Sequence, residues 1–194
     1  HQTATTVTLA LEAYDARSAG NAIEAFVDQL SNWYVRRNRR RFWKSETGMD
    51  KQSAYLTLYT CLDTVHRIMA PFMPFLADEI YQNLVQTQNN DSPISVHLTL
   101  WPEVAPIWKN DVLIESLAVV QKVVAMGRTA RESSRVRVRQ PLSRLLVHLP
   151  NDSATKAITD HKDQILEELN IKNLELISRD AQLIEYRLKP NLPR

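Results

Sequence analysis

The sequence predicts a mostly α-helical fold, in which a helical bundle precedes a small β-α-β-β module. Apolar residues recur at helical spacing from about residue 4 to residue 133, and they change to the alternating spacing of strands after residue 142. With 194 residues, 44% of them hydrophobic, the chain can bury one sizeable core or two small ones. We therefore expect a bundle over residues 1–133 and an α/β module over residues 134–194.

The first strongly patterned helix is expected over residues 21–43. Its apolar side chains lie on one face, at spacings that alternate between three and four residues. They are Ile23, Phe26, Val27, Leu30 and Tyr34. The apolar stripe covers the first half of this helix and cationic residues dominate the second half, so we expect the second half to project toward solvent or a partner.

Two further helices follow in the bundle. One is expected to begin at the N-cap residue Asp50 and to end before Pro71, because proline cannot donate a hydrogen bond to the carbonyl four residues earlier. The next is expected over residues 75–86, with Pro74 in its first turn, where a missing N–H costs nothing.

A polar stretch over residues 88–106 interrupts the helices and contains three prolines. We expect an ordered loop there with one short strand, Val96–Thr99. Beyond it, Asn110 or Asp111 is expected to cap a helix that continues to about Arg131. Two adjacent apolar stripes predict that the first half of this helix is largely buried.

Alternating apolar residues predict three strands in the last part of the chain, at residues 145–149, 171–177 and 184–188. A helix capped by Asp152 separates the first two strands, and such a helical crossover makes them parallel if they are neighbours. The short link after Ser178 makes the second pair antiparallel. Three strands and one helix bury little surface, so we expect this unit to lean on the preceding helix.

Composition excludes several classes of protein. Cys61 is the only cysteine, so no disulfide framework or cysteine metal site can form within the chain, and we expect Cys61 to be a small buried residue of a protein in the reducing cytoplasm. No apolar run approaches the roughly 20 residues that span a bilayer, and the first residues lack the layout of a signal peptide. We expect no membrane partner.

No arrangement of residues predicts catalysis. The five histidines stand in unrelated sequence contexts, no pair has zinc-ligand spacing, and no nucleophile lies beside a base. With three glycines, the chain has no glycine-rich loop that could cradle a nucleotide phosphate. We therefore expect no catalytic residue, no metal site and no cofactor in this chain.

One cationic stretch stands out because the net charge of the whole chain is only +2. Six cationic residues fall within residues 36–44, with no carboxylate among them. On a helix, Arg36, Arg40 and Lys44 share one edge, and Arg37 and Arg41 lie beside it. Like charges on adjacent turns repel, so a partner that neutralises them would explain their presence.

Three kinds of partner fit this stretch on charge alone. RNA phosphates would neutralise it, and Trp33, Phe42 and Trp43 could then stack on unpaired bases or cover the edges of a core. A solvated face and pairing with acids of another domain are the alternatives.

A second group of arginines has Glu132 as its only acid. It consists of Arg128, Arg131, Arg135, Arg137, Arg139 and Arg144. The middle three alternate with valines, so on an extended chain Arg135, Arg137 and Arg139 would point the same way and form a second anion-binding surface. The alternative is an ordinary edge strand protected by charge.

Several motifs resemble those of the isoleucyl-tRNA synthetase family. The run Leu30–Trp43 is similar to the start of the family's anticodon-binding region, in the branch shared by eukaryotic cytosolic enzymes and some bacterial ones. Further stretches match in the family's order and extend the resemblance over nearly the whole chain: Met69–Tyr81, Ser95–Leu98, Trp101–Pro102, Val136–Leu142, Glu167–Lys172 and Leu188–Asn191. The Pro-Phe-x-Pro-Phe part at residues 71–75 and the pair Trp101–Pro102 are shared with related class I synthetases, whereas the arginine-rich run and Arg139–Leu142 favour the isoleucine enzyme.

The resemblance implies a C-terminal fragment that contains the anticodon-binding domain of an enzyme that attaches isoleucine to its tRNA, using ATP and Mg²⁺. The two nucleotide-binding signatures of the catalytic domain, His-x-Gly-His and Lys-Met-Ser-Lys-Ser, do not occur, so the fragment alone should be inactive. The implied partners are an isoleucine-accepting tRNA and the missing catalytic domain of the same chain. The expected RNA-binding residues are Arg36, Arg37, Arg40, Arg41 and Lys44 for phosphates, Trp43 for stacking, and Arg135, Arg137 and Arg139 as a second surface.

Other hypotheses stay open at this point. The bundle could be a structural scaffold whose arginine run docks on the catalytic domain. The chain could also be a free-standing RNA-binding module, or the equivalent domain of a related class I synthetase such as the valine enzyme.

Overall fold

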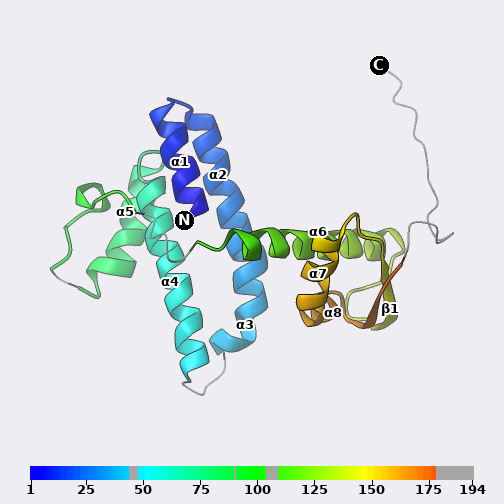
Figure 1. Ribbon diagram of the computed structural model, residues 1–194. Helices are drawn as coiled ribbons and strands as arrows, with labels where there is room; N and C mark the ends of the chain where they lie inside the picture. The colour runs from blue at the N-terminus through cyan, green and yellow to red at the C-terminus, as the bar shows by residue number, and fades with distance from the viewer. Residues whose placement is uncertain (44–47, 90, 104–108, 178–194) are drawn as a thin grey trace. The chain divides into compact units, whose positions relative to one another are not determined.

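The computed structural model describes residues 1–43, 48–89, 91–103 and 109–177, and helices dominate it, as the sequence predicts (Figure 1). The chain divides into two compact units, residues 1–109 and residues 110–194. The sequence-based boundary lies after residue 133 instead. The two boundaries differ because helix α6 (Asp111–Ser133) packs against helices of the second unit, α7 (Asp152–Asp160) and α8 (Lys162–Leu169).

The first unit begins with a helical hairpin of α1 (Gln2–Glu12) and α2 (Ala16–Gln29), which lie side by side (Figure 1). Asp15 caps α2 by accepting a hydrogen bond from the Ser18 N–H over 2.9 Å, which holds the pKa of this carboxyl below its usual value. Helix α2 therefore begins five residues before the predicted start at residue 21.

The cationic stretch extends the same helical rod. After α2 the chain makes a π-helical turn, η1 (Leu30–Val35), and then continues as α3 (Arg36–Trp43). The prediction that the helix reaches Trp43 is thus confirmed, and the apolar residue Ile23 is buried as the stripe predicts.

Helix α4 (Met49–Met69) runs back along α3, α2 and α1, and then leads to α5 (Pro74–Tyr81) and a second π-helical turn, η2 (Gln82–Gln86). Pro74 occupies the first turn of α5, which confirms its predicted place. The N-cap residue of α4 is Gly48, and Asp50 lies within the first turn of the helix.

The predicted strand Val96–Thr99 is wrong, because these residues begin a 3₁₀-helix, η3 (Val96–Leu98). Asp78 of α5 accepts hydrogen bonds from the Ser95 hydroxyl (2.7 Å) and the Val96 N–H (2.9 Å). These bonds close a turn, bury Val96, and keep the pKa of Asp78 below its usual value. The alternating apolar residues therefore belong to a turn that hydrogen bonds attach to α5, and not to a strand.

The core of the first unit has two parts. One joins α1, α2 and α4 through Ala4, Val7, Ala19, Ile23, Val65 and Ile68. The other joins the end of α4 to α5 and η3 through Met69, Ala70, Ala77, Tyr81 and Val96. His66 is fully buried; its Nδ1 lies 2.9 Å from the Leu62 carbonyl oxygen, and burial lowers its pKa. Cys61 is only half-buried, and desolvation raises the pKa of its thiol.

The second unit contains α6, α7 and α8 together with two parallel strands, β1 (Leu142–Val147) and β2 (Ile171–Leu176). Leu142 pairs with Ile171 and Val147 with Leu176, so the predicted parallel pair is confirmed. The predicted crossover helix is divided at His161 into α7 and α8. The predicted strand at residues 184–188 lies outside the described residues.

Close packing joins α6 to α8. A Cβ atom at Gly127 would lie 2.5 Å from a methyl carbon of Leu169, so a larger residue at this position would require the Leu169 side chain to move. The prediction of a buried first half of α6 is wrong: Val112, Leu113 and Ile114 are exposed, because α7 and α8 pack on the later part of the helix. None of the described helices combines the length and apolar character needed to cross a membrane.

Candidate nucleic-acid interface

The positive charge of the first unit is concentrated on one segment. Residues 1–109 contain ten Lys and Arg residues and eleven Asp and Glu residues, and six of the ten cations fall within residues 36–44. The remainder of the unit is therefore acidic. A local cationic surface on an acidic body attracts a polyanion to one place and repels it elsewhere.

Four arginines of α3 form what we call the α3 arginine surface: Arg36, Arg37, Arg39 and Arg40. Arg39 and Arg40 are exposed, whereas Arg36 and Arg37 are partly buried. The Arg36 Nε donates a hydrogen bond to the Asn32 carbonyl over 2.7 Å, which fixes this side chain along the helix. Within the described part of the chain, no carboxylate pairs with Arg39 or Arg40.

Two tryptophans flank this surface. The guanidinium carbon of Arg37 lies 5.3 Å from the centre of the Trp33 ring, and that of Arg39 lies 6.0 Å from the centre of the Trp43 ring. Both are cation–π contacts between residues four apart on a helix. The Trp43 side chain is 80% exposed, so its ring is accessible to a planar group such as a nucleobase.

Arg41 and Phe42 turn toward the neighbouring helix. Arg41 forms a bidentate ion pair with Asp50 of α4, over 2.9 Å from Nε and 2.6 Å from Nη2, and it also donates to the Asp50 carbonyl oxygen. Phe42 is buried and its ring lies 5.1 Å from that of Tyr55. These contacts hold α3 against α4, so Arg41 serves the structure as well as carrying charge. Lys44 lies outside the described residues.

Sequence reasoning missed Arg39 as a site residue. Its signal was present, because Arg39 and Trp43 are four residues apart and an arginine can stack on an aromatic ring at that spacing. The sequence also left Phe42 open between stacking on a base and covering the core, and the structure places it in the core.

The second expected surface also has exposed arginines, at Arg135, Arg137 and Arg139. The predicted extended conformation is wrong. Arg135 has a φ of 55°, and the Gln140 N–H donates to the Arg137 carbonyl oxygen over 3.0 Å, which closes a turn. The three side chains therefore project from a turn-rich loop and not from one face of a strand.

The other arginines of that group have partners within the second unit. Arg131 is 4% exposed and donates to main-chain carbonyl groups. Arg128 pairs with Glu168, and Arg144 lies 3.7 Å from Glu175. These three residues support the fold of the second unit.

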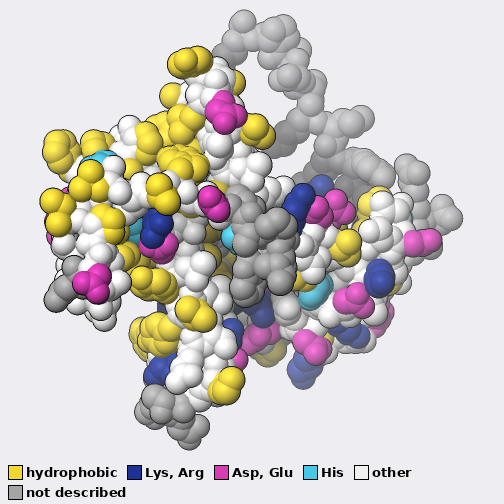
Figure 2. All heavy atoms as spheres, turned by 60° about the vertical axis from the view of Figure 1, so that its left-hand side comes forward, with side chains coloured by type: hydrophobic (Ala, Val, Ile, Leu, Met, Phe, Trp, Pro, Cys, Tyr) yellow, Lys and Arg dark blue, Asp and Glu magenta, His cyan; other side chains and the backbone are white. Residues whose placement is uncertain are grey.

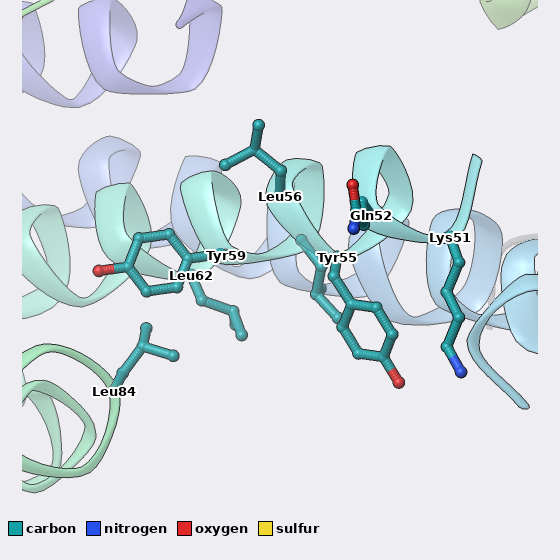
Figure 3. A pocket seen from close by; sticks show the side chains of 8 residues that line it. Lys51, Gln52, Tyr55, Leu56, Tyr59, Leu62 and Leu84 are labelled. Atoms are coloured by element: carbon teal, nitrogen blue, oxygen red, sulfur yellow. The ribbon is translucent and has the colours of Figure 1, made fainter. Parts of the chain in front are cut away.

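A groove with a volume of about 610 Å³ lies between α4 and η2 in the first unit. Figure 3 shows Leu84 of η2 facing Leu62 and Tyr59 of α4, with Tyr55 farther along α4 toward Lys51. Exposed hydrophobic side chains also cover much of the face of the first unit shown in Figure 2. The groove lining contains no acid–base pair, so its chemistry favours binding over catalysis. Among the described residues, no three His, Cys, Asp or Glu side chains gather in a way that could hold a metal ion.

Comparison with known proteins agrees with the geometry. Residues 1–146 match the model of the family described as "Anticodon-binding domain of tRNA ligase". This range contains both exposed arginine groups and most of the described chain. The match confirms the anticodon-binding domain that the sequence motifs imply.

Curated relatives cover nearly all of this chain. It is 45% identical over 192 residues to the isoleucine–tRNA ligase of Deinococcus radiodurans, covering 99% of this chain and 17% of that protein. It is 43% identical over 187 residues to the isoleucine–tRNA ligase of Thermus thermophilus, covering 96% of this chain and 18% of that protein. The corresponding ligase of Clostridium novyi is 44% identical over 184 residues, covering 94% and 17%. The chain thus spans less than a fifth of the length of these relatives.

Proposed function

Because the chain belongs to the family of anticodon-binding domains of tRNA ligases, we propose that it is the part of an isoleucine–tRNA ligase that holds the anticodon stem-loop of tRNA. The identity of 43–45% to isoleucine–tRNA ligases supports the choice of isoleucine over valine. The observation that carries the proposal is the α3 arginine surface with its two tryptophans.

The chemistry of this surface suits a folded RNA. Guanidinium groups on successive turns of a helix contact successive phosphates and release counterions, which supplies affinity without reading sequence. An exposed indole at the end of the same helix stacks on an unpaired base, of which an anticodon loop offers several. We assign phosphate contacts to Arg36, Arg37, Arg39 and Arg40, and stacking to Trp43.

The remaining steps belong to the longer protein. We propose that attachment of isoleucine, with its ATP and Mg²⁺, takes place in a catalytic domain of the same polypeptide in the cytoplasm. The present chain would position the tRNA and would not activate isoleucine alone.

A titration of tRNA against the chain tests the proposal. The variant Arg39→Gln/Arg40→Gln removes two exposed charges of the α3 arginine surface. Its affinity for tRNA should fall about tenfold at moderate salt, and the slope of log K against log salt should become shallower by about two. The matched control is Arg17→Gln/Lys122→Gln, which removes two exposed charges elsewhere.

The control should bind tRNA nearly as well as the unaltered chain. If the Arg39/Arg40 variant retained full affinity and an unchanged salt slope, the phosphate assignment would be wrong. Competition between isoleucine-accepting and valine-accepting tRNA would decide the amino acid, since the proposal requires preference for the isoleucine-accepting species.

The apolar groove between α4 and η2 favours a second role, as a scaffold that docks on the rest of the ligase. Its lining offers six Tyr and Leu side chains, which suit an apolar polypeptide segment better than RNA. A Leu56→Cys probe in a Cys61→Ser background should react with a thiol reagent in the isolated chain and be protected in the full-length ligase. Equal reactivity in both would exclude docking at this groove.

A further inference from the structure

The loop that carries the second group of exposed arginines is held from inside by two side chains. We call residues 134–140 the arginine loop. The buried Arg131 donates from Nη1 to the carbonyl oxygens of Arg137 (3.0 Å) and Gln140 (3.1 Å). Asn170 donates from Nδ2 to the carbonyl oxygens of Val138 and Arg139, both over 3.0 Å. Four consecutive carbonyl groups therefore point inward.

The two side chains that hold the loop are themselves fixed. Arg131 Nη2 donates to the carbonyl oxygens of Leu169 (2.6 Å) and Asn170 (3.2 Å), which ties α6 to the end of α8. Asn170 adopts the left-handed conformation with a φ of 49°, which asparagine tolerates better than most residues. The loop is thus anchored on the core of the second unit.

Inward carbonyl groups leave the opposite side of the loop electropositive. Within the described residues, the main-chain N–H groups of Arg137, Val138 and Arg139 have no hydrogen-bond acceptor in the chain. The side chains of Arg135, Arg137 and Arg139 are exposed on the same short segment. N–H groups without an acceptor in the fold can donate to an anion, and the guanidinium groups add full charges on the same segment.

We propose that the arginine loop is a preformed phosphate-binding loop that grips the RNA backbone, with Arg131 and Asn170 as its positioning residues. The inference rests on the proposed function for the choice of RNA over an acidic protein, because the family match at residues 1–146 includes the loop. Since the main chain is fixed before binding, less conformational entropy is lost when the phosphate arrives.

The first test removes the charges. In Arg135→Gln/Arg137→Gln/Arg139→Gln, affinity for tRNA should fall about tenfold or more, and the salt slope should become shallower by about two to three. The matched control, Lys122→Gln/Lys156→Gln/Lys172→Gln, removes three exposed charges from the same unit and should change affinity less than about threefold.

The second test leaves every charge in place. Asn170→Gly keeps the left-handed backbone accessible but removes the amide that holds the Val138 and Arg139 carbonyl groups. We expect faster hydrogen exchange at the Gln140 amide and a several-fold weaker affinity for tRNA, with an unchanged circular dichroism spectrum. A purely charge-driven surface would lose no affinity in this variant.

The outcomes separate this inference from the proposed function. If the unaltered chain binds tRNA and only the α3 variant weakens, the loop assignment is overturned and the proposed function stands. If the unaltered chain binds a deca-glutamate peptide more tightly than tRNA, the loop is a site for an acidic protein and the RNA assignment is overturned. Absence of any tRNA binding would overturn the proposed function and, with it, this inference.

Discussion

The α3 arginine surface and the arginine loop present the same chemical group on two different supports. On α3, the helix itself spaces the guanidinium groups, and stacking on Trp33 and Trp43 steadies two of them. On the loop, the order comes from Arg131 and Asn170, which hold the main chain from beneath. Arginines on a helix are positioned by the helix alone, whereas arginines on a loop depend on other residues that hold the main chain of the loop.

Each region also contains one arginine that holds neighbouring elements of the fold together. Arg41 joins α3 to α4 through an ion pair at the surface, where the side chains of Arg41 and Asp50 are 35% and 75% exposed. Arg131 is buried and satisfies only carbonyl groups. The same residue type should therefore contribute little to stability in the first unit and much in the second.

The largest expected effect comes from Arg131. Replacing it by Met removes one hydrogen-bond donor from each of four carbonyl groups, and should lower the free energy of unfolding of the second unit by about 3 kcal/mol. All four tryptophans lie within residues 1–109, so tryptophan fluorescence follows the first unit and circular dichroism follows both. We expect this variant to unfold at a lower denaturant concentration than the unaltered chain when unfolding is followed by circular dichroism. The transition followed by fluorescence should not shift.

Arg144→Met is the control for this comparison, because Arg144 is exposed and only loosely paired with Glu175. It should change stability by less than about 0.5 kcal/mol. If Arg131→Met and Arg144→Met lowered the free energy of unfolding by similar amounts, burial of the Arg131 guanidinium would not be what makes Arg131 important for stability.

A smaller effect is expected from Arg41. Arg41→Gln should lower the stability of the first unit by about 0.5–1 kcal/mol, because the ion pair with Asp50 is partly exposed. Arg40→Gln, one residue away and exposed, should leave the urea midpoint of tryptophan fluorescence almost unchanged while weakening tRNA binding more. The comparison fails if Arg40→Gln destabilises the unit as much as Arg41→Gln does.

The smallest expected effect is on the pH dependence of stability, and it concerns His66, a buried residue of the first unit. Burial lowers the pKa of His66, against weaker opposing effects of the Leu62 carbonyl and Asp63, while Arg67 adds to the lowering. The unfolded chain therefore takes up a proton near pH 6.5 and the folded unit does not, so stability is full above that pH and falls as the pH drops below it.

We expect the urea midpoint of the first unit to be lower at pH 5.5 than at pH 7.5, and this difference to shrink in His66→Phe. An unchanged pH dependence in His66→Phe would remove His66 as its source.

The sequence predicted the helices and strands better than the hydrogen bonds between residues that are distant in the chain. Local pattern was enough to predict the helix that reaches Trp43 and, with a short crossover, the parallel strand pair. The alternation at Val96 and at Arg135–Arg139 suggested extended chain, but hydrogen bonds from distant residues decided otherwise. Asp78 lies 18 residues from Val96, and Asn170 lies 32 residues from Val138. Such long-range partners leave no local signal.

For the candidate site as well, the sequence indicated the residues but not the contacts that each of them makes. The cationic run was visible as composition, yet which arginine is exposed and which pairs with Asp50 depends on how α4 packs. The buried Arg131 was grouped with its exposed neighbours, because nothing adjacent to it in the sequence reveals the four carbonyl groups that surround it in the fold.

Phosphate ethylation interference on isoleucine-accepting tRNA tests the central claim most directly, because it shows which phosphates the chain must contact. The account predicts that ethylation interferes at phosphates of the anticodon stem-loop, and that part of this interference disappears in Arg39→Gln/Arg40→Gln but persists in Arg17→Gln/Lys122→Gln. Interference confined to the acceptor arm, or an unchanged pattern in the Arg39/Arg40 variant, would contradict it.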